Sequence, residues 1–214
     1  IVAAMRRAMA VAHRAGLTGV HDMGGPAAFG AEQILRQSGE LSLRVTKSIP
    51  FENLDAALSL GLRSALGDDW LRIGAVKIFA DGALGPRTAW MLEGYDTAPG
   101  ETGISTTDPQ AIREGVRRAN EAGLDCATHA IGDRAVRTVI DIYADLAVEN
   151  KQRGLRNRIE HVQLVHPADE QRLAQHGIIA SMQPLHATSD MLMADRHWGK
   201  RCAGAYALKT MLKH

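Results

Sequence analysis

The sequence has 214 residues, of which 45% are hydrophobic and 23% are charged, and its formal net charge is +1. This composition is typical of a soluble globular domain with one substantial core, and the small net charge argues against a nucleic-acid partner. Two cysteines are too few for a disulfide framework, and no apolar run reaches the length of a membrane span. We therefore expect a cytoplasmic protein without a membrane or nucleic-acid partner, in which homo-oligomers are allowed but not required.

A repeated order of helix, glycine and β-branched run organises the chain. Residues 2–14 show an amphipathic helical pattern, and a glycine that follows a helical stretch is the residue that most often ends a helix. The repeat predicts six strands, at residues 17–23, 40–49, 71–79, 124–130, 156–164 and 178–184.

The helices between the later strands carry their own start signals. Asp108 and Pro109 are typical of a cap and a first helical residue, so a helix is expected over 108–123. Residues 133–147 repeat their apolar positions with a period of 3.6, and Pro167 followed by acidic residues predicts a helix within 166–177.

Alternating strands and helices, with strands apolar enough to be buried on both faces, indicate an α/β fold with a parallel sheet. An open dinucleotide-binding sheet would carry G-x-G-x-x-G after its first strand, and that spacing is missing from residues 21–30. Polar residues stand instead at the carboxyl ends of most strands: His21, Asp22, Lys47, Asp81, His129, His161, Gln183 and His186. This distribution favours a (β/α)8 barrel. Six strands are two fewer than a barrel needs, so residues 1–214 are expected to be part of one.

Residues 83–107 have no periodicity and are rich in glycine, proline and threonine. A connection of this length is more often an active-site loop than a simple link.

Lys77 is the first residue that could carry chemistry. Strand alternation places it on the side of Ile73 and Phe79, which would face into the barrel. A lysine among apolar neighbours has a lowered pKa, and its neutral amine can act as a base, form a Schiff base, or take up CO2 as a metal-binding carbamate. The simpler interpretation is a lysine that pairs with Asp81 or extends its amine to solvent.

His129 and His161 form the second candidate. They end successive strands and are separated by one strand–helix unit, so at matching heights both imidazoles could reach one metal ion. Each alone is more simply a core histidine, but together with Lys77 on the preceding strand they favour a hydrolytic metal site. His186 is a candidate substrate contact, and Asp133 is expected to cap the helix after His129 rather than to act as an acid.

Three stretches resemble a known family: residues 76–91, 128–144 and 158–184. They are similar to the amidohydrolase superfamily, in particular to the YtcJ-like branch of amidohydrolase family 3, which is related to N-substituted formamide deformylases. The resemblance implies a metal-dependent (β/α)8 barrel with a small β-sandwich. By position, Lys77 would match the often carbamylated lysine of the fourth strand, and His129 and His161 the histidine ligands of the fifth and sixth.

The departures from this pattern are also informative. The chain has no H-x-H motif, and the eighth-strand aspartate that serves as general base has no counterpart in it. We therefore expect strands 2–7 of the barrel, without the first strand, the last strand and the sandwich domain. A chain of this extent is expected to be inactive by itself, with no catalytic base among its own residues.

The expected function of the intact protein is hydrolysis of a C–N bond in a small amide or formamide by metal-activated water, with one or two zinc or similar divalent ions. Asp81, Arg87 and His186 are candidates for contacting either a metal ligand or the substrate. Two alternatives remain: a barrel enzyme with a Schiff-base lysine of the aldolase type, and a non-catalytic relative with a regulatory or binding role.

Overall fold

The computed structural model describes residues 1–214 and contains two compact units. The first comprises residues 1–77 and 121–125, and the second comprises residues 78–120 and 126–214. None of the helices has the length and apolar character that crossing a lipid bilayer requires.

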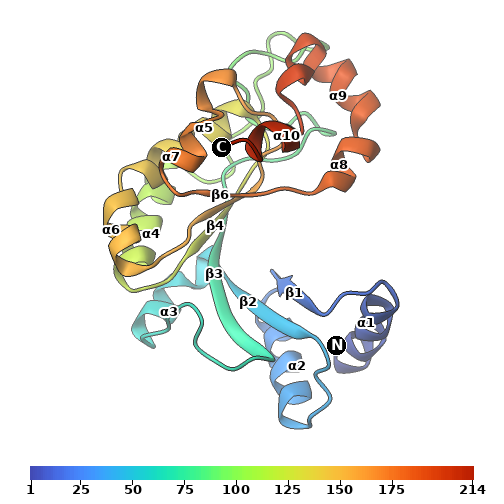
Figure 1. The fold of residues 1–214 in the computed structure, drawn as a ribbon, viewed down its shortest axis with the longest axis vertical. Coiled ribbons are helices and arrows are strands. Elements are labelled where there is room, and N and C mark those ends of the chain that lie inside the picture. The colour runs from blue at the N-terminus through green and yellow to red at the C-terminus, as the bar shows by residue number, and fades with distance from the viewer. The chain divides into compact units, whose positions relative to one another are not determined.

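The first unit contains three strands and three helices (Figure 1). In chain order they are α1 (Val2–Arg14), β1 (Gly19–Asp22), α2 (Pro26–Gln37), β2 (Arg44–Pro50), a 3-10 turn (Phe51–Asn53), α3 (Leu54–Ser59) and β3 (Leu71–Phe79), whose last two residues belong to the second unit. β1 pairs with β2 and β2 pairs with β3, both in parallel.

The apolar side of α1 packs as the sequence pattern predicts. Met9 lies in a buried cluster with Leu35 of α2 and with Leu41, Leu43 and Val45, at the start of β2. Gly16 and Gly39 follow the two helices with positive φ angles of 78° and 74°, which glycine adopts without the strain that a side chain would add.

The ends of β1 and β2 hold a group of charged side chains. Lys47 of β2 is buried and donates hydrogen bonds to Asp22 at the end of β1 and to the carbonyl of Gly24. Burial would raise the pKa of Asp22, but hydrogen bonds from Lys47, the Gly24 amide and Glu32 lower it. Burial, together with the negative charge of Asp22, raises the pKa of Glu32 to about 7.

Glu32→Gln is expected to change how stability depends on pH. Because the pKa of Glu32 is raised in the folded state, folding retains a proton that the unfolded chain releases, so stability falls from about pH 4.5 to about pH 7. The glutamine variant should lose this decline, which amounts to at most about 3 kcal/mol. Urea unfolding at pH 5 and pH 8 measures this change in the free energy of unfolding, and Glu52→Gln, at an exposed position, is the control. Identical pH dependence of Glu32→Gln and wild type would contradict the expectation.

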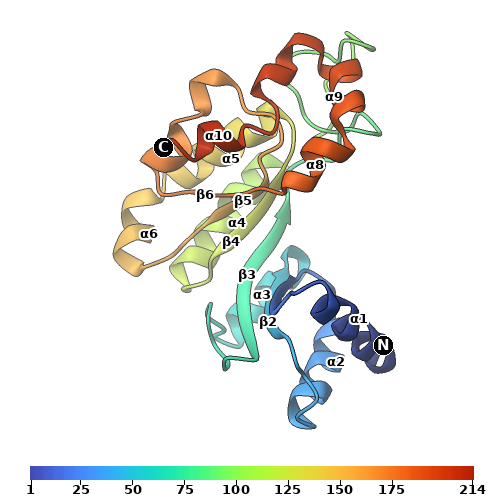
Figure 2. The ribbon, with the colours of Figure 1, turned by 45° about the vertical axis from the view of Figure 1, so that its right-hand side comes forward.

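The second unit contains the other three strands, which pair in parallel in the order β4, β5, β6 (Figure 2). Its elements are α4 (Pro109–Glu121), β4 (Cys126–Ala130), α5 (Asp133–Ala144), α6 (Ala147–Arg153), β5 (Arg158–His161), a 3-10 turn (Pro167–Asp169), α7 (Arg172–Gln175), β6 (Ile179–Ser181), α8 (Pro184–Ser189), α9 (Met191–Trp198), a second 3-10 turn (Gly199–Gly204) and α10 (Leu208–Met211).

All six predicted strands are present, their order in the sheet follows the chain, and the fold is a partial (β/α)8 barrel as expected. Asp108 caps α4 as predicted, since its carboxylate accepts hydrogen bonds from the amides of Gln110 and Ala111. The predicted cap at Asp133 is wrong. Gly132 is the cap residue of α5, and the Asp133 carboxylate accepts a hydrogen bond from the amide of Leu92 instead.

Two predicted helices are shorter than expected. The helical pattern over 133–147 is interrupted after Ala144, and a new helix, α6, begins at Ala147. The segment 166–177 forms a 3-10 turn and a four-residue helix, with His166 as the cap of the turn.

Residues 83–107 are irregular but well packed. A cluster of fully or nearly fully buried side chains ties this segment to the elements around it: Leu84, Ala89, Met91, Tyr95, Ile131, Leu164, Ala194 and Trp198. The Tyr95 hydroxyl donates a hydrogen bond of 2.7 Å to the carbonyl of Ala89. The segment therefore has its own small core, which gives one wall of the second unit a defined shape.

Candidate functional site

Three histidines lie in a row at the carboxyl ends of the strands in the second unit. The ring of His129, on β4, is 4.7 Å from that of His161, at the end of β5, measured between ring centroids. The ring of His186, on α8, lies 5.6 Å beyond His161. The structure therefore brings together the two histidines predicted as metal ligands and the one predicted to contact substrate.

Hydrogen bonds fix the orientation of the two inner rings. The Nε2 of His129 lies 2.7 Å from the carbonyl oxygen of Gly82, and because a carbonyl only accepts, this nitrogen carries the proton. The Nδ1 of His161 lies 2.8 Å from the Oε1 of Gln183, whose amide nitrogen donates to the carbonyl of Ser181. In the neutral rings, the lone pairs are then on Nδ1 of His129 and Nε2 of His161. Metal-binding histidines are commonly oriented in this way by an oxygen on the opposite ring nitrogen.

The backbone at His161 has an unusual conformation. His161 has a φ of 77° and the following Val162 has a φ of 46°, in the left-handed region that non-glycine residues rarely occupy. This turn ends β5 three residues earlier than the hydrophobic pattern predicts. Such strain costs on the order of 1–3 kcal/mol per residue and is concentrated at functional sites.

Asp81 holds the wall of the site together. Its carboxylate accepts hydrogen bonds from the backbone amides of Trp90 at 2.9 Å, Ile131 at 3.0 Å and Gly132 at 2.8 Å, and one of its oxygens lies 3.4 Å from Nε2 of His129. Burial raises the pKa of Asp81 to about 7, although the three amides act in the opposite direction. Asp81 therefore joins the segment after β3 to the turn after His129.

Gly132 is required at this turn because the backbone of another segment approaches it closely. A Cβ atom at this position would lie only 2.1 Å from the carbonyl oxygen of Trp90. The same carbonyl accepts hydrogen bonds from the amides of Arg134 and Ala135, at the start of α5. The turn after His129 is therefore packed directly against the segment that Asp81 anchors.

Lys77 lies near the end of β3, in the part of the strand that belongs to the first unit. It is 6% exposed, which agrees with the expectation of a buried lysine. Phe79, two residues farther along the strand, belongs to the second unit, where its ring centroid lies 5.3 Å from that of His129. Whether Lys77 acts with the histidines stays a prediction.

The two other candidates lie in more exposed positions. Arg87 forms an ion pair of 3.0 Å with Glu101, and both side chains are exposed. The Nδ1 of His186 lies 3.2 Å from a carboxylate oxygen of Asp190, and its side chain is 41% exposed. His186 therefore lies at the accessible end of the histidine row.

Several polar contacts around the row are not predictable from the sequence pattern. Gln183 stands at the end of a predicted strand, but its bond to His161 follows from the turn after β6 and not from any local motif. Arg158, Glu160 and Ser181 form a partly buried network, in which the Ser181 hydroxyl lies 2.7 Å from Glu160 and 2.7 Å from Arg158. The alternation R-x-E within a buried strand is the sequence signal that could have indicated this network.

The donor set fits a metal ion in part. Two correctly oriented imidazoles are present, but no group of three or more His, Cys, Asp or Glu side chains is arranged to hold an ion. A metal ion at these two imidazoles would therefore need a third ligand of another type.

Comparisons with known proteins identify the family of the chain. Two curated relatives match about 70% of the chain: "Protein LONG AFTER FAR-RED 3" of Arabidopsis thaliana is 35% identical over 154 residues, and "Putative amidohydrolase YtcJ" of Bacillus subtilis (strain 168) is 34% identical over 148 residues. These matches cover 72% and 69% of this chain, but only 26% and 27% of the relatives.

A solved structure is similar over nearly the whole chain. An uncharacterized metal-dependent hydrolase from Pyrococcus furiosus superposes with a TM-score of 0.86 at 32% identity, and the match covers 97% of this chain and 43% of that protein. The chain thus spans about a quarter of the length of the curated relatives and less than half of the solved one. The model of the amidohydrolase family (Amidohydro_3) matches residues 1–214 in full, so the chain belongs to the amidohydrolase family.

Proposed function

We propose that the protein is a metal-dependent hydrolase that cleaves a C–N bond in a small amide or formamide. The observation that supports this most strongly is the pair of adjacent imidazoles at the ends of β4 and β5, each oriented by an oxygen on one ring nitrogen. The amidohydrolase family and the similarity to a metal-dependent hydrolase from Pyrococcus furiosus support the coarser part of this proposal, metal-dependent hydrolysis.

The residues that would hold the ion are Nδ1 of His129, Nε2 of His161 and Lys77, the last as a carbamate. A bound divalent ion, zinc or a similar one, would polarise the scissile carbonyl and lower the pKa of a water molecule. One or two ions are compatible with this set, and the proposed site of action is the cytoplasm.

The other residues of the site would position these groups. The Gly82 carbonyl keeps His129 in the tautomer with its proton on Nε2, and Gln183 does the same for the Nδ1 proton of His161. Asp81 fixes the turn that follows His129. His186, which is partly exposed, would contact a substrate that approaches the row.

The test is made on the full-length protein. Its metal content is measured, and its hydrolysis of N-substituted formamides, simple amides and matched esters is assayed. We expect bound divalent metal and release of amine from a formamide or amide, with activity lost after chelation and restored by zinc. Absence of metal, or hydrolysis that is unaffected by chelation, would overturn the proposal. Borohydride trapping of Lys77 with a carbonyl compound would favour the Schiff-base alternative instead.

Gln183→Leu is expected to weaken metal binding about 10–100-fold, because the Nδ1 proton of His161 loses its acceptor and the ring loses its fixed orientation. Gln183→Glu retains an acceptor at this position and should keep most of the affinity. Competition with a chromophoric chelator measures the difference, with the exposed Gln171→Leu as the matched control. Equal affinities of the Leu and Glu variants would show that Gln183 does not position His161.

A further inference from the structure

A hollow of about 360 Å³ lies in the second unit, between the start of α5, the loop after β5 and the 3-10 turn Gly199–Gly204. Its lining includes Leu92, Asp133, Val165, Pro167, Lys200 and Gly204. The residues of the histidine row do not belong to this lining. The volume is within the range of pockets that bind small molecules, so the polar groups at its wall decide which molecules suit it.

Asp133 places a carboxylate with one unused oxygen at this hollow. The residue is 5% exposed, and its Oδ1 accepts a hydrogen bond from the amide of Leu92 at 2.8 Å. Its Oδ2 accepts no hydrogen bond and is not closed to solvent. Because Asp133 lines the hollow and is otherwise buried, the open part of its carboxylate lies at the hollow. A carboxylate oxygen in such a place favours an N–H or O–H donor.

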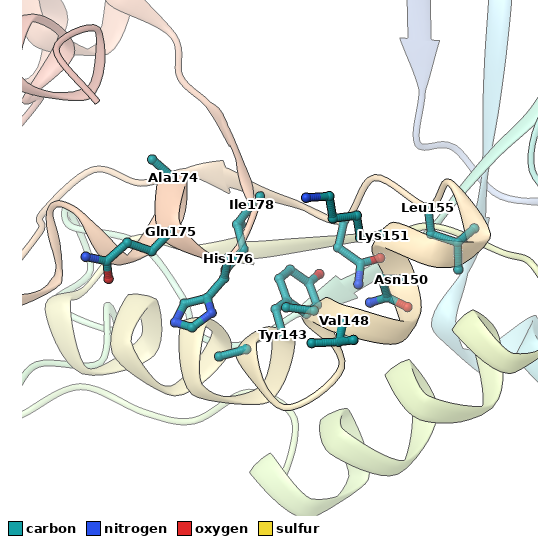
Figure 3. A pocket seen from close by; sticks show the side chains of 13 residues that line it. Tyr143, Val148, Asn150, Lys151, Leu155, Ala174, Gln175, His176 and Ile178 are labelled. Atoms are coloured by element: carbon teal, nitrogen blue, oxygen red, sulfur yellow. The ribbon is translucent and has the colours of Figure 1, made fainter.

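A wider hollow in the same unit shows the contrast. It has a volume of about 570 Å³ and lies beside α6 and α7, where Figure 3 shows Tyr143, Asn150 and His176 among the side chains around it. The unpaired Oδ1 of Asn150 is closed to solvent, so a molecule in the wider hollow cannot reach it. The unused oxygen of Asp133, in contrast, can be approached.

The charges of the lining are balanced. Two acidic residues, Glu93 and Asp133, and two basic residues, Lys200 and Arg201, line the hollow. The guanidinium of Arg201 already donates to the backbone carbonyls of Glu93 and Gly94 and to the carboxylate of Asp96. Lys200, which is exposed at the edge, is therefore the cation that remains for a ligand.

A molecule with one ammonium and one carboxylate suits both groups. Its ammonium would donate to Oδ2 of Asp133, its carboxylate would face Lys200, and an apolar side chain would lie against Leu92, Val165 and Pro167. An amine alone would leave Lys200 without a counterion, and a carboxylate alone would be repelled by Asp133. We propose that this hollow binds a free α-amino acid with an apolar side chain. Such binding is independent of the hydrolytic function proposed above.

Calorimetric titration of the full-length protein with L-leucine and two analogues tests this. 4-Methylpentanoate lacks the ammonium and 3-methylbutylamine lacks the carboxylate, but both keep the apolar chain. We expect leucine to bind about 10–100-fold more tightly than 4-methylpentanoate, the range for a hydrogen bond to a charged group. It should bind about two- to fivefold more tightly than the amine, since an exposed cation contributes less. Absence of leucine binding, or equal binding of 4-methylpentanoate, would overturn the proposal.

Two variants with matched controls locate the binding. Asp133→Asn removes the negative charge but keeps an oxygen for the Leu92 amide, and it should weaken leucine binding about 10–100-fold. Asp145→Asn, at an exposed position outside the hollow, should leave leucine binding unchanged. Lys200→Met should remove most of the advantage of leucine over 3-methylbutylamine, whereas the exposed Lys151→Met should keep it.

Leucine can also chelate a metal ion through its amine and carboxylate, so the titration is repeated with His161→Ala. We expect leucine binding to persist in this variant and to be lost in Asp133→Asn. Binding that is lost in His161→Ala and kept in Asp133→Asn would mean that leucine binds at the histidine row, and the proposal would be overturned.

Discussion

Replacement of His161 or His129 by alanine is expected to abolish metal binding by the full-length protein. In the proposed site the two adjacent imidazoles are the only nitrogen ligands, so removal of either should leave too few donors for stable binding. Loss of a residue that hydrogen-bonds to a metal ligand typically reduces activity roughly 10–100-fold. Loss of a metal ligand itself should reduce the rate of hydrolysis by more than this. Metal content by elemental analysis and the rate of amine release are the two measurements.

His166→Ala is the matched control, because this exposed histidine follows His161 by only five residues and lies outside the row. It should leave both metal content and rate unchanged. Retention of wild-type metal in both His129→Ala and His161→Ala would rule out these residues as ligands. Loss of metal in all three variants would indicate a folding defect rather than a missing ligand.

Asp81→Asn is expected to produce the largest loss of stability, about 2–4 kcal/mol. The aspartate accepts three backbone amides through its two oxygens, whereas asparagine has one oxygen and would point an amide nitrogen at the remaining donors. Unfolding by urea after removal of metal measures this loss without a contribution from ligand binding.

Asp96→Asn serves as the control within the same irregular segment. Asp96 is exposed and pairs with Arg201 at 3.1 Å, so its substitution should change the free energy of unfolding by less than about 1 kcal/mol. If the two variants are equally stable, Asp81 does not hold the segment and the turn together.

The strands and their polar ends were predictable because the signals are local. The alternation around Lys77, the apolar run before His129 and the glycines after helices each lie within a few residues of the feature that they predict. Val76 and Ile78, on the side of β3 that was expected to face helices, are both at 0% exposure.

The features that were missed depend on contacts between distant residues. Asp133 has the sequence context of a cap, but Leu92, 41 residues earlier, provides the amide that its carboxylate binds. Asn120 and Asn157 are 37 residues apart, and nothing in either neighbourhood indicates that their amides meet. The left-handed turn at His161 likewise has no glycine or asparagine to mark it.

The three amides held by Asp81 have a consequence for local motion. They belong to two stretches about 40 residues apart, one around Trp90 and one at Ile131 and Gly132, and a single buried carboxylate satisfies all of them. If either stretch opens, backbone amides lose the Asp81 carboxylate as their acceptor. The two stretches should therefore unfold and refold as one cooperative unit. We therefore expect the wall beside His129 to open as one body rather than as a flap.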